Sequence, residues 1–223
     1  MSRRPERILI PALLALLAGC STDVALRDPT IPDPLVPQIP IAVGARYPEA
    51  FDHFIHQEQV IGKEKWQIDL GQSNKLLFNK LFASMFRDFK VVQGDGDPSS
   101  FGVDALIEPS IDAFEFSVPE QSQTDAFAVW IRYRIKIFDR QGTQIANWPI
   151  SAYGKSQTST FGGDEALRRA AVLAMRDAAA LIIMQMDKTT GISSLAKANA
   201  QSDAGSDSVI KTTAVEELND DAG

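Results

Sequence analysis

The sequence has 223 residues but only one cysteine, Cys20, and two histidines. A single cysteine excludes an intrachain disulfide, a redox-active pair of thiols and a zinc site built from several cysteines. The Gly-x-Ser-x-Gly motif of serine hydrolases is also absent, and no serine-rich loop has a nearby histidine or lysine arranged as a base. We therefore expect a protein that is not an enzyme and that needs neither a metal nor a cofactor.

Positive charge is scarce as well. The chain has 22 Lys and Arg residues against 29 Asp and Glu residues, a formal net charge of -7. An acidic surface is a poor match for phosphate backbones, so we expect no nucleic-acid partner. The same charge argues against broad adhesion to anionic lipid headgroups.

The chain begins with a short apolar run. Residues 8–18 follow three arginines and are almost entirely apolar. This run is too short to span a bilayer as a mature helix, but it has the length typical of the central region of a secretion signal. The N-terminal segment is therefore predicted to direct export.

The export segment ends in Leu17, Ala18, Gly19 and Cys20. This pattern resembles the bacterial lipobox, in which cleavage precedes the cysteine and the thiol receives a diacylglyceryl group. The alternative is an ordinary cleaved signal followed by a chance cysteine. By the same resemblance, Ser21 rather than aspartate after the cysteine implies sorting to the outer membrane. Two or three acyl chains, palmitate among them, would make a stable anchor, since one chain alone holds a protein only marginally.

Composition divides the chain into four parts. Residues 1–19 are the predicted lipoprotein signal peptide, and residues 20–38 hold the lipidated cysteine and a proline-rich stretch. This stretch is predicted to be an extended tether. Residues 39–188 form the predicted periplasmic domain, and residues 189–223, poor in large apolar side chains, are predicted to be a disordered tail.

Two periodicities define the predicted domain. Apolar residues from Phe78 to Phe89 recur at helical spacing, with Ser73 as a plausible N-cap, and a long alanine-rich helix is expected over residues 164–188. Residues 127–138 alternate cleanly between apolar and polar side chains, and residues 139–142 form a hairpin turn.

Further strands are expected over residues 39–47, 66–70, 104–118 and 143–155. Pro109 in the third of these implies an edge position or a bulge. The order of elements predicts an α+β fold: a two-layer sandwich of a mixed, antiparallel-rich sheet of about four to five strands with two helices on one face.

The lipobox, the helix after the segment 66–71, the hairpin of residues 133–142 and the final long helix resemble a group of small proteobacterial outer-membrane lipoproteins. The group includes the YajG-type lipoproteins, the LPS-assembly lipoprotein and activators of penicillin-binding proteins, with a fold related to the N-terminal domain of TolB. The resemblance covers residues 39–188 and rests on element order rather than on a diagnostic motif. It implies non-enzymatic work as an accessory to a larger envelope machine.

A basic strip is the main candidate for partner docking. Arg132, Arg134 and Lys136 fall on the polar face of the alternating segment, and that face is expected to be exposed to solvent. A solvated strand face is the simpler interpretation. The alternative is docking of a carboxylate-rich partner, a glycan or a lipid phosphate.

The remaining candidates for chemistry are weaker. His53 and His56 would share a face only on a helix, where they could join a metal site; on a strand they would point to opposite faces. Residues 94–97, Gly-Asp-Gly-Asp, resemble the start of a calcium loop but lack its later ligands, which favours a turn.

The sequence therefore supports three functional hypotheses. The first is an outer-membrane lipoprotein on the periplasmic face, attached by its lipid, that serves as an interaction module with an envelope protein partner; its oligomeric state is not predicted. The second is a carrier of lipid or glycolipid, in which the phenylalanine-rich helix lines a groove. The third is an envelope hydrolase that uses an acid/base pair such as Asp69 and Glu108. The spacing of these two residues in the sequence gives no support for such a pair.

Overall fold

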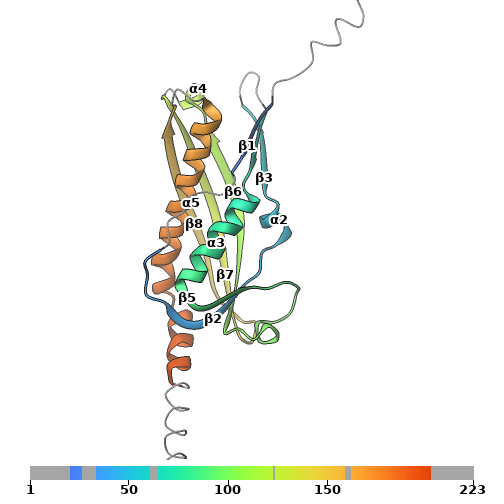
Figure 1. Ribbon diagram of the computed structural model, residues 1–223, viewed down its shortest axis with the longest axis vertical. Helices are drawn as coiled ribbons and strands as arrows, with labels where there is room; N and C mark the ends of the chain where they lie inside the picture. Colours follow the sequence, from blue (N-terminus) through green and yellow to red (C-terminus); the bar gives the residue numbers. More distant parts are fainter. Residues whose placement is uncertain (1–20, 27–33, 61–64, 123, 159–161, 202–223) are drawn as a thin grey trace, which may run out of the picture.

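Two sheets organise the part of the chain that the computed structural model describes, which is residues 21–26, 34–60, 65–122, 124–158 and 162–201 (Figure 1). One sheet has five strands and the other has three. Helices pack on the larger sheet, which confirms the predicted α+β class. The smaller sheet is an addition that the sequence did not indicate. Among the described residues, no helix is both long and apolar enough to cross a membrane.

The larger sheet has the strand order β5-β2-β6-β7-β8. Its central strand β6 is parallel to β2 and antiparallel to β7, and β7 is antiparallel to β8. The last three strands are therefore the predicted meander, closed by the predicted hairpin turn. The bounds of the five strands are Ile39–Ala45 (β2), Phe86–Val91 (β5), Ala105–Ser117 (β6), Ala126–Asp139 (β7) and Gln144–Gln157 (β8).

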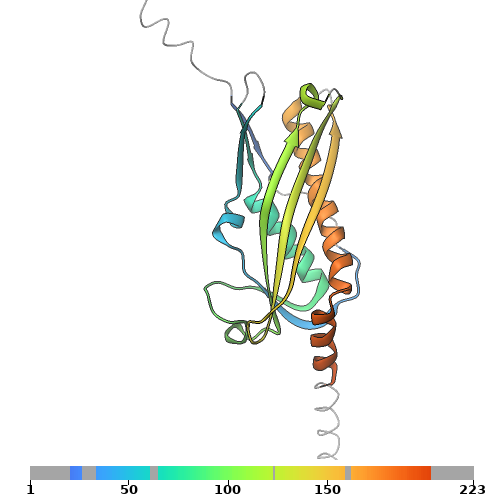
Figure 2. The same cartoon turned by 180° about the vertical axis from the view of Figure 1, so that it is seen from behind.

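The two long helices, α3 (Gly71–Met85) and α5 (Gly163–Asp187), cover one face of this sheet, as predicted (Figures 1 and 2). Alanines form the buried stripe of α5 and bring its backbone very close to β8. A Cβ atom on Gly154 of β8 would lie 2.0 Å from the carbonyl oxygen of Ala170 and 2.4 Å from the backbone nitrogen of Ala174. Only glycine fits at this crossing.

The smaller sheet has the order β1-β4-β3, with bounds Ser21–Ala25 (β1), Lys65–Asp69 (β4) and Ile55–Gln59 (β3). Its first strand corrects the prediction of a tether over residues 20–38. Residues 21–25 run parallel to β4, and Val24 and Leu26 are buried. Val24 and Leu26 are two residues apart, so both side chains lie on the face of the strand that packs into the core. The prolines that follow in the sequence do not prevent this packing.

The prediction of a disordered tail over residues 189–223 is also wrong for its first part. A further helix occupies residues 190–201, and Ile192 is buried against the core. The side chain of Asn199 donates a hydrogen bond of 2.6 Å to Asp104, so this helix is fixed at two points. Residues 202–223 lie outside the described part of the chain.

The phenylalanine-rich helix ends earlier than its periodicity predicts. α3 stops at Met85, and Phe86 and Phe89 belong to β5, which turns back so that both rings contact Phe82. Ser73 is not the N-cap, because the helix already begins at Gly71. Its hydroxyl instead donates a hydrogen bond to the carbonyl of Leu26 and ties α3 to the end of β1.

Short helical turns complete the fold: α2 (Glu49–Asp52), the 3₁₀ turn Pro98–Phe101 and α4 (Pro119–Ser122). Pro109 lies where the sequence predicts, at a locally open edge. The pairing of β6 with β2 ends at Ile107, and a shift in register follows between Ile111 and Ala113.

Two backbone positions on the outer edge of β8 have no free N–H donor. The backbone N–H of Tyr153 points away from β7 and donates to the carboxylate of Asp177 on α5 over 3.0 Å. Pro149, four residues earlier and therefore on the same side of the strand, has no N–H at all. At these two positions the edge therefore has no N–H donor to offer to another strand.

Aromatic packing fills the space between α3 and the sheet. Phe78 of α3 is fully buried, and its ring centroid lies 5.5 Å from that of Tyr133 on β7. Tyr133 is also fully buried, and its hydroxyl donates a 2.6 Å hydrogen bond to the side-chain oxygen of Asn74. Burial raises the pKa of Tyr133 far above its usual range, so the phenol remains a proton donor.

We expect Tyr133→Phe to lower the free energy of unfolding by about 1–3 kcal/mol, because the buried oxygen of Asn74 would lose its donor. Denaturant unfolding followed by tryptophan fluorescence measures this loss. Tyr153→Phe is the matched control, since Tyr153 is exposed and its change should have no effect on stability. Equal stability of the two variants would contradict the proposed role of the buried hydrogen bond.

Candidate functional site

The predicted basic strip lies on the outer face of the large sheet, opposite the helices. Arg132 is exposed, and Arg134 and Lys136 are partly buried on the same side of β7. The strip is not uniform, however. Arg134 forms an ion pair of 2.5 Å with Asp112 and a hydrogen bond of 3.3 Å with Asn147. Its charge is therefore already neutralised within the sheet.

Arg132 has a different environment. Its neighbours on the outer face are Trp130, two residues earlier on β7, and Tyr153, which pairs with Trp130 across the β7–β8 ladder. The two aromatic rings are tilted by 46° with centroids 5.1 Å apart, and they are 44% and 43% exposed. Within the described residues, no partner of the Arg132 guanidinium is found. We call Trp130, Arg132 and Tyr153 the outer-face patch.

The patch borders a shallow hollow of about 330 Å³, which Glu115, Ser151 and the backbone of neighbouring strands complete. Trp130 could have been found from the sequence, because it shares the outward parity of Arg132 in the alternating segment. Tyr153 could not, since its position opposite Trp130 depends on the register of the hairpin. The arrangement presents two rings for apolar contact and one unpaired cation.

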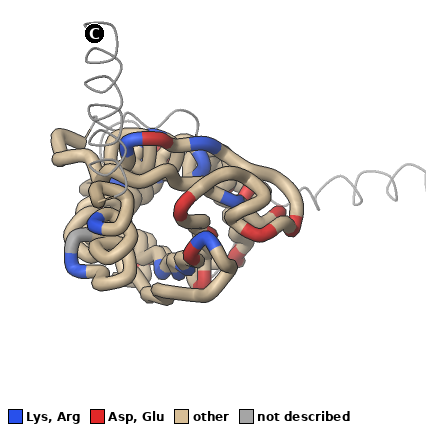
Figure 3. Tube along the Cα trace, turned by 90° about the horizontal axis from the view of Figure 1, so that it is seen from below, with Lys and Arg blue, Asp and Glu red and all other residues tan. Residues whose placement is uncertain are grey.

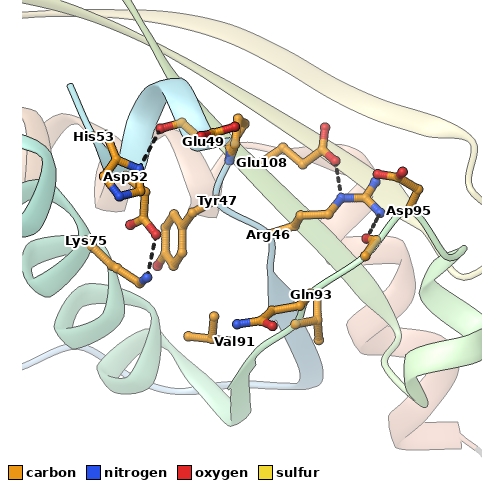
Figure 4. Close-up of a pocket in the computed structure, with 13 residues that line it drawn as sticks. Arg46, Tyr47, Glu49, Asp52, His53, Lys75, Val91, Gln93, Asp95 and Glu108 are labelled. Atoms are coloured by element: carbon orange, nitrogen blue, oxygen red, sulfur yellow. Dashed lines mark hydrogen bonds and ion pairs between the residues drawn. The ribbon is translucent and has the colours of Figure 1, made fainter.

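A second hollow, of about 510 Å³, lies between the end of β2, α2 and the loop after β5 (Figure 4). We call it the β2–α2 cleft. Its charged side chains come from four separate segments of the chain. In the view from below in Figure 3, acidic and basic residues lie close together along the backbone. The charged residues that line the cleft are Arg46, Glu49, Asp52, Lys75, Asp95 and Glu108.

The cations of the β2–α2 cleft are paired within the protein. Arg46 binds Glu108 at 2.5 Å and also donates to the carbonyl oxygens of Gly94 and Gly96 at 2.9 and 3.0 Å. Lys75 binds Asp52 at 2.6 Å (Figure 4). The cleft therefore offers no unengaged cation for a ligand, and its polar contacts connect β2, β6 and α3.

These contacts also bear on one of the weaker candidates, the Gly-Asp-Gly-Asp segment, and on the state of Tyr47. The guanidinium of Arg46 donates to the carbonyl oxygens of Gly94 and Gly96, and the chain bends at Gly94 and Asp95, where Gly94 has a positive φ. Tyr47 donates a 2.7 Å hydrogen bond to Asn79, and burial, assisted by the charge of Asp52, raises the pKa of its phenol above the ordinary range. This tyrosine is thus held protonated and is no base.

The two histidines do not share a face. His53 follows the last residue of α2, whereas His56 is in β3, where its ring lies 4.9 Å from that of Phe114. Its Nε2 atom is 3.1 Å from a carboxylate oxygen of Glu58. Across the described ranges, no group of three His, Cys, Asp or Glu side chains is placed to hold a metal ion.

The structure separates the acid/base pair of the hydrolase hypothesis. Asp69, at the end of β4, accepts a hydrogen bond of 3.2 Å from the backbone of Gly71. Glu108 lies in the other sheet, bound to Arg46. The rings that the carrier hypothesis places along a groove belong to the core, because Phe78 and Phe82 of α3 are fully buried.

The lipobox residues Leu17, Ala18, Gly19 and Cys20 lie outside the described part of the chain. Their cleavage and lipidation therefore remain predictions of the sequence. What the structure adds is the environment of the next residue, Ser21, which is the first residue of β1.

Comparisons with known proteins support the fold. The sequence matches no protein-family model, and no curated protein matches it. Its structure is similar to a crystal structure from Xanthomonas campestris described by the family model DUF330, with a TM-score of 0.52 and 14% identity, covering 78% of this chain and 99% of the other. At this identity the likeness shows a shared fold.

Two further solved structures are similar at lower scores. A hypothetical protein from Chlamydia trachomatis has a TM-score of 0.42 and 9% identity, over 66% of this chain and 96% of its own. A minor lipoprotein from Acinetobacter baumannii has a TM-score of 0.38 and 13% identity, over 67% of this chain and 92% of its own.

Proposed function

We propose that this protein is a lipid-anchored, non-enzymatic interaction module on the periplasmic face of the outer membrane. It would serve an envelope assembly or transport machine, docking a protein partner through the outer-face patch. The anchor is inferred from the lipobox at Cys20, and the outer-membrane location from Ser21, which follows it.

One observation carries the docking site. Trp130 and Tyr153 remain nearly half exposed, whereas Phe114, Phe116, Phe127 and Tyr133 of the same sheet are buried, and an unpaired arginine lies beside the exposed pair. Tryptophan, tyrosine and arginine are the residues that most often dominate the binding energy of protein interfaces. Arg132 would pair with a carboxylate of the partner, and the rings would cover an apolar side chain.

Of the three residues in the basic strip, only Arg132 is proposed to contact the partner directly. Arg134 is held by Asp112 and contributes position more than charge, whereas Lys136 lies further along β7, opposite Glu108 of β6. The proposed contact centre therefore moves from the three basic residues to the end of the strip where the aromatic pair lies.

We expect Trp130→Ala to weaken partner binding about 30-fold, which corresponds to about 2 kcal/mol for truncation of a central interface residue. A photoreactive phenylalanine analogue in place of Tyr153, expressed in the full chain, should crosslink one stoichiometric protein in intact cells. The yield of this crosslink should fall strongly when Trp130→Ala or Arg132→Ala is added. Thermal unfolding of both variants should match that of the wild type, because both side chains are exposed.

The control uses the other face of the molecule. Leu173 on α5 is 42% exposed, similar to Tyr153, but lies away from the patch. The same analogue at position 173 should give no such crosslink, and Leu173→Ala should leave the crosslink from position 153 unchanged. Equal crosslinking from both positions, or insensitivity to Trp130→Ala, would show that the patch is not the docking site.

A further inference from the structure

The first strand begins immediately after the predicted site of lipidation. β1 starts at Ser21, which pairs with Lys65 at the start of β4, and the ladder continues to Ala25 opposite Asp69. The next residue, Leu26, is buried, and its backbone N–H donates a 3.1 Å hydrogen bond to the carbonyl of Asp69. The chain after Cys20 is thus fixed to the folded domain from its first residue.

This arrangement leaves almost no free chain between the lipid and the domain. Adjacent Cα atoms are about 3.8 Å apart, whereas an extended tether of about eighteen residues would reach roughly 60 Å. The headgroup layer outside the hydrocarbon core is only about 5–8 Å thick on each side of a bilayer. A cysteine whose acyl chains enter the hydrocarbon core must therefore hold Ser21 at the level of the headgroups.

The structure shows which end of the domain this is. The first residues of β1 lie at the upper end of the long axis in Figures 1 and 2, beside the end of β3 and the start of β4. At these strand ends Gln59 pairs with Lys65. The β7–β8 turn and the helix of residues 190–201 lie at the opposite, lower end.

We propose that the domain rests directly on the membrane surface through this upper end and stands with its long axis away from the bilayer. The inference depends on the lipidation of Cys20 in the proposed function. The upper end of the domain contacts the lipid headgroup layer. The short connection between Cys20 and β1 holds the domain there, rather than an attraction between charges. The fourteen residues of β7 span about 45 Å, so the turn at its end projects well into the periplasm.

Three labelling positions test this orientation in the full, lipidated chain. Gln59, Gln141 and Ser151 are exposed at the upper end, at the β7–β8 turn and on the outer sheet face. Each is changed to cysteine and labelled with a fluorophore, since the thiol of Cys20 is blocked by its lipid. The proteins are then reconstituted into phosphatidylethanolamine and phosphatidylglycerol vesicles that carry a headgroup nitroxide quencher.

We expect strong quenching at position 59 and little at positions 141 and 151. Equal quenching at positions 59 and 151 would mean that the domain lies on its outer face, which overturns the proposal. Absence of quenching at all three positions in vesicle-bound protein would mean that β1 does not hold the anchor close, and this also overturns it.

A matched variant distinguishes contact of the domain with the membrane surface from attachment by the lipid. Insertion of about twenty Gly and Ser residues between Cys20 and Ser21 gives a flexible link with a mean span of about 25 Å. This variant should stay bound to vesicles but lose most of the quenching at position 59; unchanged quenching would overturn the role of chain length. Cys20→Ala should release the protein from membranes. A wild-type chain that never binds membranes would refute the anchor of the proposed function itself, and the contact with the membrane surface with it.

Discussion

Gly154→Ala should destabilise the domain by about 3 kcal/mol or more, which lowers the melting temperature of a protein of this size by about 6–12 °C. The added methyl group would lie 2.0 Å from the carbonyl oxygen of Ala170 and 2.4 Å from the nitrogen of Ala174. Both atoms belong to the backbone of α5, so no side-chain rotation relieves the overlap. The helix must move away from β8, and its buried alanine stripe would lose packing along its length.

Two controls isolate the cause of this effect. Lys155→Ala changes the adjacent exposed residue and should leave the melting temperature unchanged. Gly94→Ala tests the cost of a backbone conformation alone, because Gly94 has a φ of +89° and no atom within 4 Å of the added methyl group. It should cost about 1–2 kcal/mol. A Gly154→Ala variant as stable as Lys155→Ala would show that the close helix–strand contact is wrong.

Asp104→Asn should cost about 2–3 kcal/mol, because a buried carboxylate would lose charge-assisted hydrogen bonds to three segments. Asp104 is only 5% exposed and accepts from the backbone of Ala42, from Arg140 and from Asn199. An amide in its place would direct an N–H toward one of these donors. We also expect faster hydrogen exchange over residues 190–201, since that helix would lose the contact of Asn199 with Asp104 and would be held by its apolar contacts alone.

The pH dependence gives an independent check. Burial alone would raise the pKa of Asp104, but the hydrogen bonds from Ala42, Asn199 and Arg140 outweigh it and hold the pKa below its ordinary value. The folded state thus binds this proton less readily than the unfolded chain, whose carboxylate titrates near about 4. The stabilisation is complete above that pH and disappears as the pH falls through the lower pKa of the folded state.

Denaturant unfolding between neutral and acidic pH should therefore show a shallower acid-induced loss in Asp104→Asn than in the wild type. The control is Asp112→Asn, which removes the ion pair with Arg134 on the sheet surface and should cost less than about 1 kcal/mol. If Asp112→Asn were the more damaging change, Asp104 would not be the point that joins the three segments.

The elements that the sequence predicts well are those with long local patterns. The alternation of β7, the hairpin turn and the alanine-rich stripe of α5 each specify one structure within a single segment. The sequence predicts a helix that extends to Phe89, because Phe86 and Phe89 continue its apolar spacing. Both residues are instead in β5, which folds back onto α3 so that their rings pack against Phe82. β1 and the helix of residues 190–201 are short, and their stability comes from contacts that only the folded domain provides.

The outer-face patch could likewise be predicted only where a local pattern in the sequence specifies it. Arg132 and Trp130 lie on one face by the two-residue period of a strand, which the sequence displays. Tyr153 reaches them only because the β7–β8 register shifts by one residue between Ile137 and Phe138. Without that irregularity, every side chain of β8 would face the opposite side of the sheet, and no local pattern specifies it. The cleft contacts of Arg46 depend likewise on segments far apart in the chain.

The outer edge of β8 limits how another strand could extend the larger sheet. An open strand edge is a template for pairing with the strands of other chains. Pro149 has no N–H and the N–H of Tyr153 is bound by Asp177, so an added strand would lack two of its hydrogen bonds along this edge. Recognition at this side of the molecule therefore relies more on side chains, whose specificity can change by substitution while the backbone of the sheet stays the same.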